Sequence, residues 1–224
     1  MSKPYYEAYD DRYRQIHAEN LQWFMDGPSP IVSEIIAQFG IDPTERILEI
    51  GCGEGRDALF LLRQGYDVLA TDVSMEAIDY CRKQNPEYSH RFQVLDCLRE
   101  TLPERFDYIY AVAVIHMLVP DYDRSAFYRF IRTHLKENGI ALICTMGDGT
   151  AERQTDIRTA FDLQERQHEQ TGKTVNIAGT SCRMVNFDHF TQELTAGGLE
   201  ILKTGSTSIE PDFPVMMYAV VKKE

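Results

Sequence analysis

The sequence predicts an α/β fold with a doubly wound, mostly parallel sheet. Between residues 45 and 146, short aliphatic runs alternate with amphipathic segments, which is the order of βαβ units. The segment ILEIGCGEGRD, residues 47–57, places three glycines at every second position where the first aliphatic run ends. Acidic residues end further aliphatic runs, at the edge where open parallel sheets bind ligands.

Each element of this core has its own pattern. Gly65 follows the first amphipathic run, where it suits a left-handed helix cap, and Ser74 precedes the second, where its hydroxyl can cap the helix. Gly139 ends the third helix. The predicted strands are residues 46–50, 67–72, 91–96, 106–118 and 140–146. The predicted helices are residues 57–65, 74–84 and 124–139.

The flanks follow different patterns. Residues 5–24 carry an apolar stripe at i+3/i+4 spacing, which predicts one helix. The stripe consists of Tyr6, Tyr9, Tyr13, Ile16, Asn20 and Trp23. Residues 147–182 are polar and poor in aliphatics, so we expect a partly helical insertion over the sheet. A helix at 186–198 and strands at 199–205 and 214–223 complete the prediction.

The length of 224 residues suits one domain. We divide it into an N-terminal helical lid (1–30), a ligand-binding core (45–146), an insertion on the substrate side (147–185) and a C-terminal helix with two strands (186–224). Such a chain buries roughly 70% of its unfolded surface, so its fold needs neither a disulfide nor a metal.

Composition excludes several classes of function. The net charge of −12 offers few cations for phosphates, so we do not expect a nucleic-acid partner. We find no apolar run long enough to span a membrane and no signal peptide. The five cysteines form no CxxC pair, which predicts free thiols in the cytoplasm. No cluster of side chains has metal-ligand spacing.

The glycine segment indicates what kind of ligand binds. Glycine permits positive φ and lets a ligand approach the backbone at the start of a helix. A dinucleotide oxidoreductase would carry G-x-G-x-x-G, whereas this spacing is G-x-G-x-G. Glu49 would also repel a phosphate, so its carboxylate favours a ligand with a cationic or amino group.

Two further acids extend this site. Asp72 ends the second strand, where a carboxylate can accept both hydroxyls of a ribose, and Asp96 ends the third, where it can accept from an exocyclic amine. Either acid alone could be a helix cap or a solvated loop residue. Together with Glu49 they predict a pocket for a nucleoside with a cationic or amino-acid appendage.

Residues 45–146 resemble class I S-adenosylmethionine (AdoMet) dependent methyltransferases, whose successive motifs they carry in order. The matching segments are RILEIGCGEGRDALFLLRQGYDVLATDVS, VLDC, FDYIYAVAVIHML and KENGIALICTM. The N-terminal tyrosines are similar, more loosely, to the thiopurine and tellurite-resistance type enzymes. The resemblance implies a Rossmann-like sheet of seven strands whose last strand, 214–223, is antiparallel. The N/D-P-P-Y/F/W motif of adenine-N6 and amide methylating branches is absent, since AVAVIH stands there.

The resemblance also implies a role for each matching residue. Glu49, Gly51 and Gly53 would line the methionine part of AdoMet, and Cys52, Ala111 and Val112 would offer backbone groups to it. Asp72 would hold the ribose, Val73 would lie beside the adenine, Asp96 would accept from its amine, and an amide of Cys97 or Leu98 would meet a ring nitrogen.

Catalysis by such an enzyme requires mainly alignment, because the sulfonium is already an activated methyl donor. His116 follows the fourth strand and is our candidate base, provided that its pKa is near neutral; the alternative is a structural histidine. His168 in the insertion could reach the acceptor, and Arg183 could pair with an acceptor carboxylate or form a surface ion pair.

The aromatic stripe has two interpretations. It could dock a helix on the edge of the sheet, or it could be a lid. As a lid, Tyr13 and Trp23 would contact AdoMet, and Tyr6 and Tyr9 would contact the acceptor.

We therefore predict an AdoMet-dependent methyltransferase acting on O, N or S of a small molecule, with S-adenosyl-L-homocysteine (AdoHcy) as the second product. The alternatives are a methyltransferase of peptides, proteins or RNA, and a non-catalytic AdoMet- or nucleotide-binding module. A dehydrogenase is a more remote alternative. The acceptor atom and the oligomeric state stay open.

Overall fold

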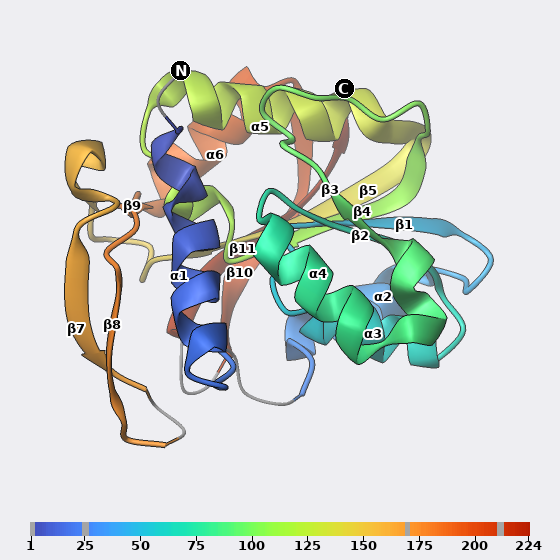
Figure 1. Cartoon of the computed structure of the whole chain (residues 1–224). Coiled ribbons are helices and arrows are strands. Elements are labelled where there is room, and N and C mark those ends of the chain that lie inside the picture. Colours follow the sequence, from blue (N-terminus) through green and yellow to red (C-terminus); the bar gives the residue numbers. More distant parts are fainter. Residues whose placement is uncertain (1–2, 24–26, 169–170, 210–212) are drawn as a thin grey trace.

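A seven-stranded sheet forms the centre of the computed structural model, which describes residues 3–23, 27–168, 171–209 and 213–224 (Figure 1). Its strand order is β10-β11-β5-β4-β1-β2-β3. The strands are β1 (Arg46–Ile50), β2 (Asp67–Asp72), β3 (Phe92–Val94), β4 (Phe106–Val112), β5 (Leu135–Met146), β10 (Leu199–Ile209) and β11 (Phe213–Lys223). β11 runs antiparallel to both of its neighbours, and the other pairs are parallel. The predicted sheet is confirmed.

Helices cover both faces of this sheet (Figure 1). On one face lie α2 (Pro30–Phe39), α3 (Arg56–Arg63) and α4 (Met75–Gln84), and on the other α5 (Asp121–His134) and α6 (Phe187–Ala196). Two separate apolar clusters result, one on each face of the sheet. The α4 helix begins as predicted, because Ser74 Oγ accepts from the amide of Ala77 at 3.1 Å.

Several predicted boundaries are wrong. The third core helix ends at His134 and not at Gly139, because residues from Leu135 onward join β5 and Leu135 pairs with Phe106. Gly139 instead lies where a Cβ would be 2.9 Å from the Phe106 carbonyl oxygen. The fourth strand stops at Val112, since Ala113 adopts a positive φ of 58°. A 3-10 turn, η3 (Ile115–Met117), follows it.

The N-terminal segment is shorter than predicted. It consists of a 3-10 turn, η1 (Tyr5–Glu7), and helix α1 (Ala8–Ala18). The chain leaves the helix through Asn20, whose φ is 57°, so Trp23 lies beyond the helix. Residue 24, the last of the predicted helix, lies outside the described residues. Helix α2 is not among the predicted elements.

The insertion is mainly β-structure, so the expectation of a partly helical segment is wrong except for one 3-10 turn. It contains two small antiparallel pairs beside the central sheet. These are β6 (Arg153–Gln154) with β9 (Arg183–Met184), and β7 (Leu163–Gln167) with β8 (Thr174–Ala178). The remaining 3-10 turns are η4 (Ile157–Thr159), within the insertion, and η2 (Pro86–Arg91) after α4.

Helix α1 bridges the insertion and the core (Figure 1). On one side Arg12 donates to the Ala178 carbonyl, at 3.1 Å from Nε and 2.8 Å from Nη2. On the other side Asp10 Oδ1 accepts from Ser74 Oγ at 2.8 Å and from the Glu76 amide at 3.0 Å, at the start of α4. α1 is therefore held at a fixed place beside the ends of the strands. None of the described helices is both long and apolar enough to cross a bilayer.

Candidate active site

A cavity of about 260 Å³ lies beyond the carboxyl ends of β1, β2, β3 and β4, under α1 and β7. From the core it is lined by the predicted residues Gly51, Asp72, Val73, Asp96, Cys97, Leu98 and Val112. From the flanks and η3 it is lined by Tyr6, Tyr9, Tyr13, Trp23, His116 and His168. The structure thus brings most of the predicted site residues to one cavity.

The glycine loop forms one edge of this cavity. Gly51, Gly53 and Gly55 all have left-handed φ values of 74°, 53° and 81°. A Cβ on Gly51 would meet Val114 Cγ2 at 2.4 Å, so the loop and the segment after β4 approach too closely for a side chain. The amides of Gly51 and Cys52 donate to the Thr71 carbonyl at 2.7 and 2.9 Å, which fixes the loop to β2.

The two predicted acids are held by backbone amides. Asp72 accepts from the Gly53 amide at Oδ2 and the Ser74 amide at Oδ1, both at 2.8 Å. Burial raises the pKa of Asp72, and these amide hydrogen bonds oppose that rise. Asp96 accepts from the Tyr6 hydroxyl at 2.8 Å and from the Leu98 amide at 3.0 Å. A carboxylate has about four acceptor sites, so both acids can accept further hydrogen bonds from a ligand.

Glu49 lies behind the glycine loop and does not line the cavity. Its side chain is buried, and among the described residues Oε2 has no hydrogen-bond partner. Burial, followed by the charge of Asp57, raises its pKa well above the usual range. The nearby Tyr110 hydroxyl and the charge of Arg56 oppose this rise, and a further cationic group nearby would oppose it more. This fits a ligand that carries an ammonium or sulfonium.

His116 lies in η3 and is buried against the cavity, with Nδ1 lacking a hydrogen-bond partner among the described residues. Burial, and then the charges of Arg124 and Arg12, lower its pKa from 6.5 to about 3. The expectation of a near-neutral pKa is therefore wrong. The imidazole is uncharged at pH 7 and a weak base, which suits accepting or donating a hydrogen bond better than removing a proton from a neutral hydroxyl.

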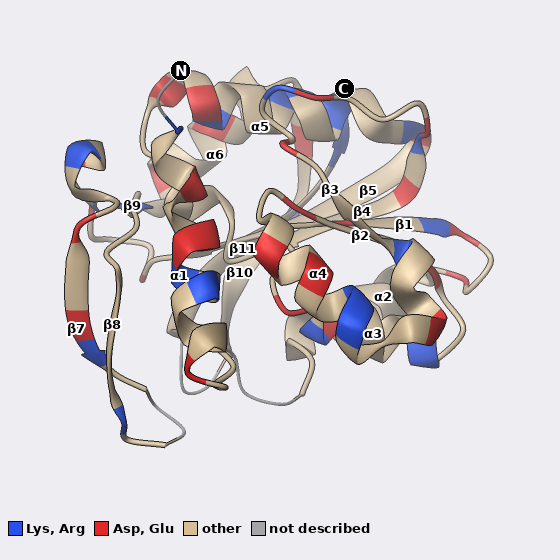
Figure 2. Ribbon diagram, viewed as in Figure 1, with Lys and Arg blue, Asp and Glu red and all other residues tan. Residues whose placement is uncertain are grey.

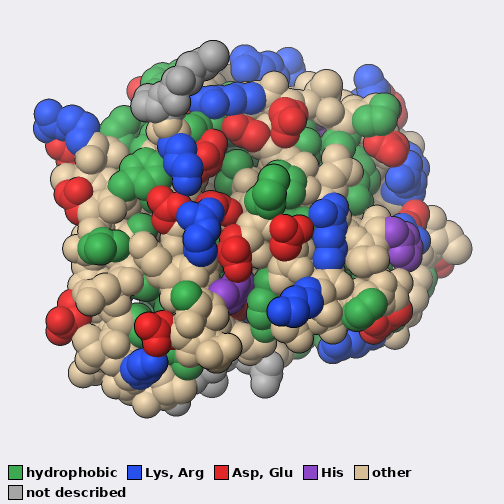
Figure 3. Space-filling model, in the orientation of Figure 1, with side chains coloured by type: hydrophobic (Ala, Val, Ile, Leu, Met, Phe, Trp, Pro, Cys, Tyr) green, Lys and Arg blue, Asp and Glu red, His purple; other side chains and the backbone are tan. Residues whose placement is uncertain are grey.

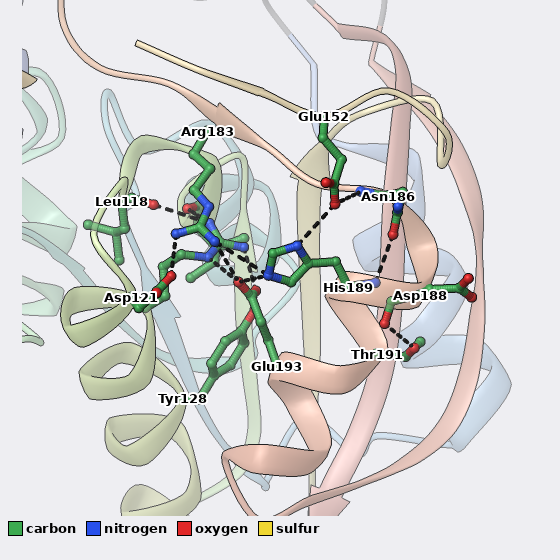
Figure 4. A network of polar contacts seen from close by, with 12 residues as sticks. Leu118, Asp121, Tyr128, Glu152, Arg183, Asn186, Asp188, His189, Thr191 and Glu193 are labelled. Carbon is green, nitrogen blue, oxygen red and sulfur yellow. Dashed lines mark hydrogen bonds and ion pairs between the residues drawn. The ribbon is translucent and has the colours of Figure 1, made fainter. Parts of the chain in front are cut away.

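The position of His116 depends on a network outside the cavity (Figure 4). Arg124 Nη1 donates to the carbonyls of Ile115 and Leu118 at 2.8 and 3.1 Å, and therefore fixes both ends of the turn that carries His116. The same guanidinium forms a bidentate pair with Glu193, at 2.7 and 2.6 Å. Tyr128 donates to that carboxylate at 2.9 Å.

The α1 side of the cavity is aromatic. Tyr13 is buried, and burial and then the charge of Asp72 raise its pKa well above the usual range. The Arg12 guanidinium lies 5.2 Å from the centre of the Tyr9 ring and 4.7 Å from that of Trp23. Sequence reasoning missed Arg12, although it follows Tyr9 by three residues and so continues the same helical face.

Further lining residues were also missed. Arg166 and Phe213 line the cavity from the insertion and from the start of β11, and Met146 lines it from the end of β5. No short-range pattern marks these positions, because the contacts that bring them to the cavity are long-range. Phe213 packs on His116 with ring centres 5.8 Å apart.

Four more of the predicted residues lie apart from the cavity, and a fifth lines it with its polar atoms already engaged. Cys52 and Ala111 are buried in the two apolar clusters, and Gly53 contributes its amide to Asp72. Arg183 does not line the cavity; it donates to the Val119 carbonyl at 2.7 Å and to Asp121 at 2.5 Å (Figure 4). His168 lines the cavity, but both ring nitrogens are engaged, with the Gln22 carbonyl at 2.6 Å and Thr171 at 3.0 Å. Within the described ranges, no three His, Cys, Asp or Glu side chains converge as a metal site would require.

Comparison with known proteins agrees with this geometry. Residues 47–139 match the family model described as a methyltransferase domain. The ubiquinone biosynthesis O-methyltransferase of Xanthomonas campestris is 29% identical over 138 residues, which is 57% of this chain and 56% of that protein. The chain therefore spans little more than half the length of this curated relative.

Solved structures show the same fold over nearly the whole chain. The 1,6-didemethyltoxoflavin-N1-methyltransferase of Burkholderia thailandensis has a TM-score of 0.71 at 17% identity, covering 100% of this chain and 91% of that one. A TehB-like SAM-dependent methyltransferase from Corynebacterium glutamicum has a TM-score of 0.61 at 20% identity, covering 97% of both chains. At sequence identities of 17% and 20%, this structural similarity establishes the fold of the chain alone. The resemblance found in the motifs is confirmed to this extent: residues 47–139 match a methyltransferase domain, and the chain has the fold of solved S-adenosylmethionine-dependent methyltransferases.

Proposed function

We propose that the protein is an AdoMet-dependent methyltransferase that methylates O, N or S of a small molecule and releases AdoHcy. One observation carries this proposal. The glycine loop, Asp72 and Asp96 meet at one cavity at the ends of adjacent strands, and both acids are fixed by backbone amides.

The cavity suits each part of AdoMet. Asp72 would accept from the ribose hydroxyls and Asp96 from the adenine amine, with Val73 and the amides of Cys97 or Leu98 beside the base. The methionine part would lie along Gly51 and Val112, which line the cavity, and the adjacent Cys52, Gly53 and Ala111 would support that edge from behind. The unpartnered Oε2 of Glu49 supports a cationic group at this end. Tyr13 and Trp23 would cover the cofactor.

The sulfonium of bound AdoMet supplies an activated methyl group. The protein has to hold the acceptor atom in line with it at about 3–3.5 Å, and such alignment can lower the barrier by roughly 7–11 kcal/mol. Tyr6, Tyr9 and His168 are our candidates for contact with the acceptor. His116, which is uncharged, would orient the acceptor through a hydrogen bond and could take up a proton only once methylation has made the acceptor acidic. Arg183 is left out of this assignment because it is paired with Asp121.

The cavity size supports a small acceptor, since about 260 Å³ under α1 and β7 has to hold the reacting groups. On the face shown, acidic and basic side chains are interspersed and form no continuous basic surface (Figures 2 and 3). This disfavours RNA as the acceptor. The described cysteines are all free thiols, which supports a cytoplasmic location.

The proposal is tested by methyl transfer from radiolabelled AdoMet into a bacterial extract that is split by molecular size. We expect label in the small-molecule fraction, and we expect Asp72→Ala to abolish it together with AdoMet binding in a titration. Asp79→Ala is the matched control, because Asp79 is an exposed acid on α4 outside the cavity. Label in the macromolecular fraction would refute the small acceptor, and AdoMet binding without transfer would favour a non-catalytic module.

A further inference from the structure

Arg12 is a buried cation without a matching anion. Its side chain is 5% exposed, and among the described residues it forms no ion pair with a carboxylate. Nε and Nη2 donate to the Ala178 carbonyl, and Nη2 also to the Gly179 carbonyl at 2.9 Å and to Thr180 Oγ1 at 2.9 Å. Nη1 donates to no described residue. Arg12 also lines the cavity, and its Nη1 carries two N–H donors that no described residue accepts.

A second arginine lines the same cavity from the insertion. Arg166 lies on β7, is exposed to solvent, and has no ion-pair partner among the described residues. Burial, and more weakly the charge of Arg166, lower the pKa of Arg12. Both arginines line the same cavity, so an anion bound there would be attracted by both positive charges.

Charge is separated by element around the cavity. Among the described residues that line it, the acids are Asp72, at the end of β2, and Asp96, two residues after β3. These acids lie on the side proposed for the cofactor. The arginines come from α1 and β7, on the side of the insertion. The wall next to them is aromatic, with Tyr9 and Trp23 under the Arg12 guanidinium.

We propose that the acceptor is an anionic aromatic compound whose carboxylate is bound by Arg12 Nη1 and Arg166. The inference rests on the proposed function, since it assigns the acceptor half of that cavity. A guanidinium matches a carboxylate in both charge and planar geometry, and charged hydrogen bonds of this kind are stronger than neutral ones. The aromatic wall provides the contact surface for the ring. Arg12 and Arg166 are thus specificity-determining residues that hold the acceptor and take no part in methyl transfer itself.

The test compares two ligands of the same size and shape that differ in charge. Protein saturated with AdoHcy is titrated with benzoate and, separately, with benzamide. We expect benzoate to bind at least about tenfold more tightly, as a charged hydrogen-bonded pair in a partly buried site should provide. Equal affinities, a preference for benzamide, or binding of neither probe would overturn the inference.

Variants locate the effect. Arg166→Gln should lower benzoate affinity by about threefold or more and leave benzamide unchanged, because an exposed cation loses one charged contact. Arg12→Lys should lower it further, since an ammonium lacks the planar fork. Arg158→Gln is the matched control: Arg158 is an exposed arginine of the insertion that is paired with Asp156 and does not line the cavity. A benzoate preference that survives both cavity substitutions would contradict this assignment.

AdoHcy affinity, measured on each sample first, separates the two proposals. AdoHcy binding without a preference for benzoate would refute the anionic acceptor and leave the methyltransferase proposal intact. Failure of the wild-type protein to bind AdoHcy would overturn the proposed function and this inference with it. If Arg166→Gln binds AdoHcy as tightly as the wild-type protein, the variant is folded and its benzoate affinity can be interpreted. This holds even where Arg12→Lys disturbs the contact of α1 with β8.

Discussion

Replacing Glu193 with alanine is expected to destabilise the protein severely and to displace His116. Arg124 is 1% exposed, and its guanidinium forms a bidentate pair with Glu193 at 2.7 and 2.6 Å (Figure 4). Without that carboxylate the Arg124 guanidinium still donates to the carbonyls of Ile115 and Leu118, but both hydrogen bonds of its ion pair with Glu193 are lost. Tyr128 also loses the acceptor of its hydroxyl.

The magnitude follows from the burial of this pair. Removing one partner of a buried ion pair costs about 3–5 kcal/mol, because the other charge stays out of water without compensation. For a chain of this size, 1 kcal/mol corresponds to roughly 2–4 °C in Tm, so we expect Glu193→Ala to lower Tm by roughly 6–20 °C. Glu193→Gln keeps the shape and some of the hydrogen bonds, and we expect a smaller loss, about 1.5–3 kcal/mol.

Urea unfolding followed by circular dichroism measures the free-energy change. Glu200→Ala is the control, since the Lys222–Glu200 pair is similar in distance, at 3.1 Å, but its side chains are 42% and 53% exposed. That substitution should cost no more than about 1 kcal/mol. A loss for Glu193→Ala as small as that of Glu200→Ala would show that the buried pair does not stabilise the turn that carries His116.

Two further perturbations test the glycine loop and α1. Gly51→Ala should abolish AdoMet binding in a titration and lower the free energy of unfolding by about 1–2 kcal/mol, because φ is +74° and the new Cβ would clash with Val114. Tight AdoMet binding by this variant would contradict the loop geometry. Burial lowers the pKa of His17, but hydrogen bonds with Glu54 and Glu76, at 3.0 and 2.8 Å, outweigh this and raise it above 6.5. These hydrogen bonds therefore stabilise docked α1 fully below pH 6.5, and this stabilisation is lost as pH rises through the raised pKa of His17. The α1 amides should exchange faster at pH 8 than at pH 6 after correction for intrinsic rates, and His17→Gln should remove the difference.

The core between residues 45 and 146 could be predicted because each element carries a local determinant. Ser74 caps a helix through its own hydroxyl, and Gly65 has the left-handed φ, 87°, that its place after a helix suggested. Asp72 and Asp96 could be placed together because parallel strands end at one edge of a sheet. Helix α2, which is not among the predicted elements, carries such determinants too, with Pro30 in its first turn and Gly40 at its left-handed cap.

The insertion and the charges of the site could not be predicted in this way. Every described residue of β7, Leu163–Gln167, is exposed, so the strand has no alternating apolar pattern and is held by backbone pairing with β8. The low pKa of His116 arises from its burial first, and then from the charges of Arg124 and Arg12, which lie on two different helices. Arg12 finds its carbonyl partners 166 and 167 residues further along the chain. These properties arise from tertiary contacts, and a single sequence does not display them.

Helix α1 borders the cavity and also contacts the insertion and α4. Its Tyr13 lines the cavity together with Asp72, its Arg12 donates to the Ala178 carbonyl of β8, and its Asp10 accepts from the Glu76 amide of α4. Helix α1 therefore borders both halves of the cavity, so the affinities for the proposed cofactor and for the proposed acceptor both depend on its position. A substitution that loosens α1 should weaken cofactor and acceptor binding in equal proportion, whereas one that alters a single contact should change the ratio of the two. That ratio, and not either affinity alone, distinguishes a lost contact from a shifted helix.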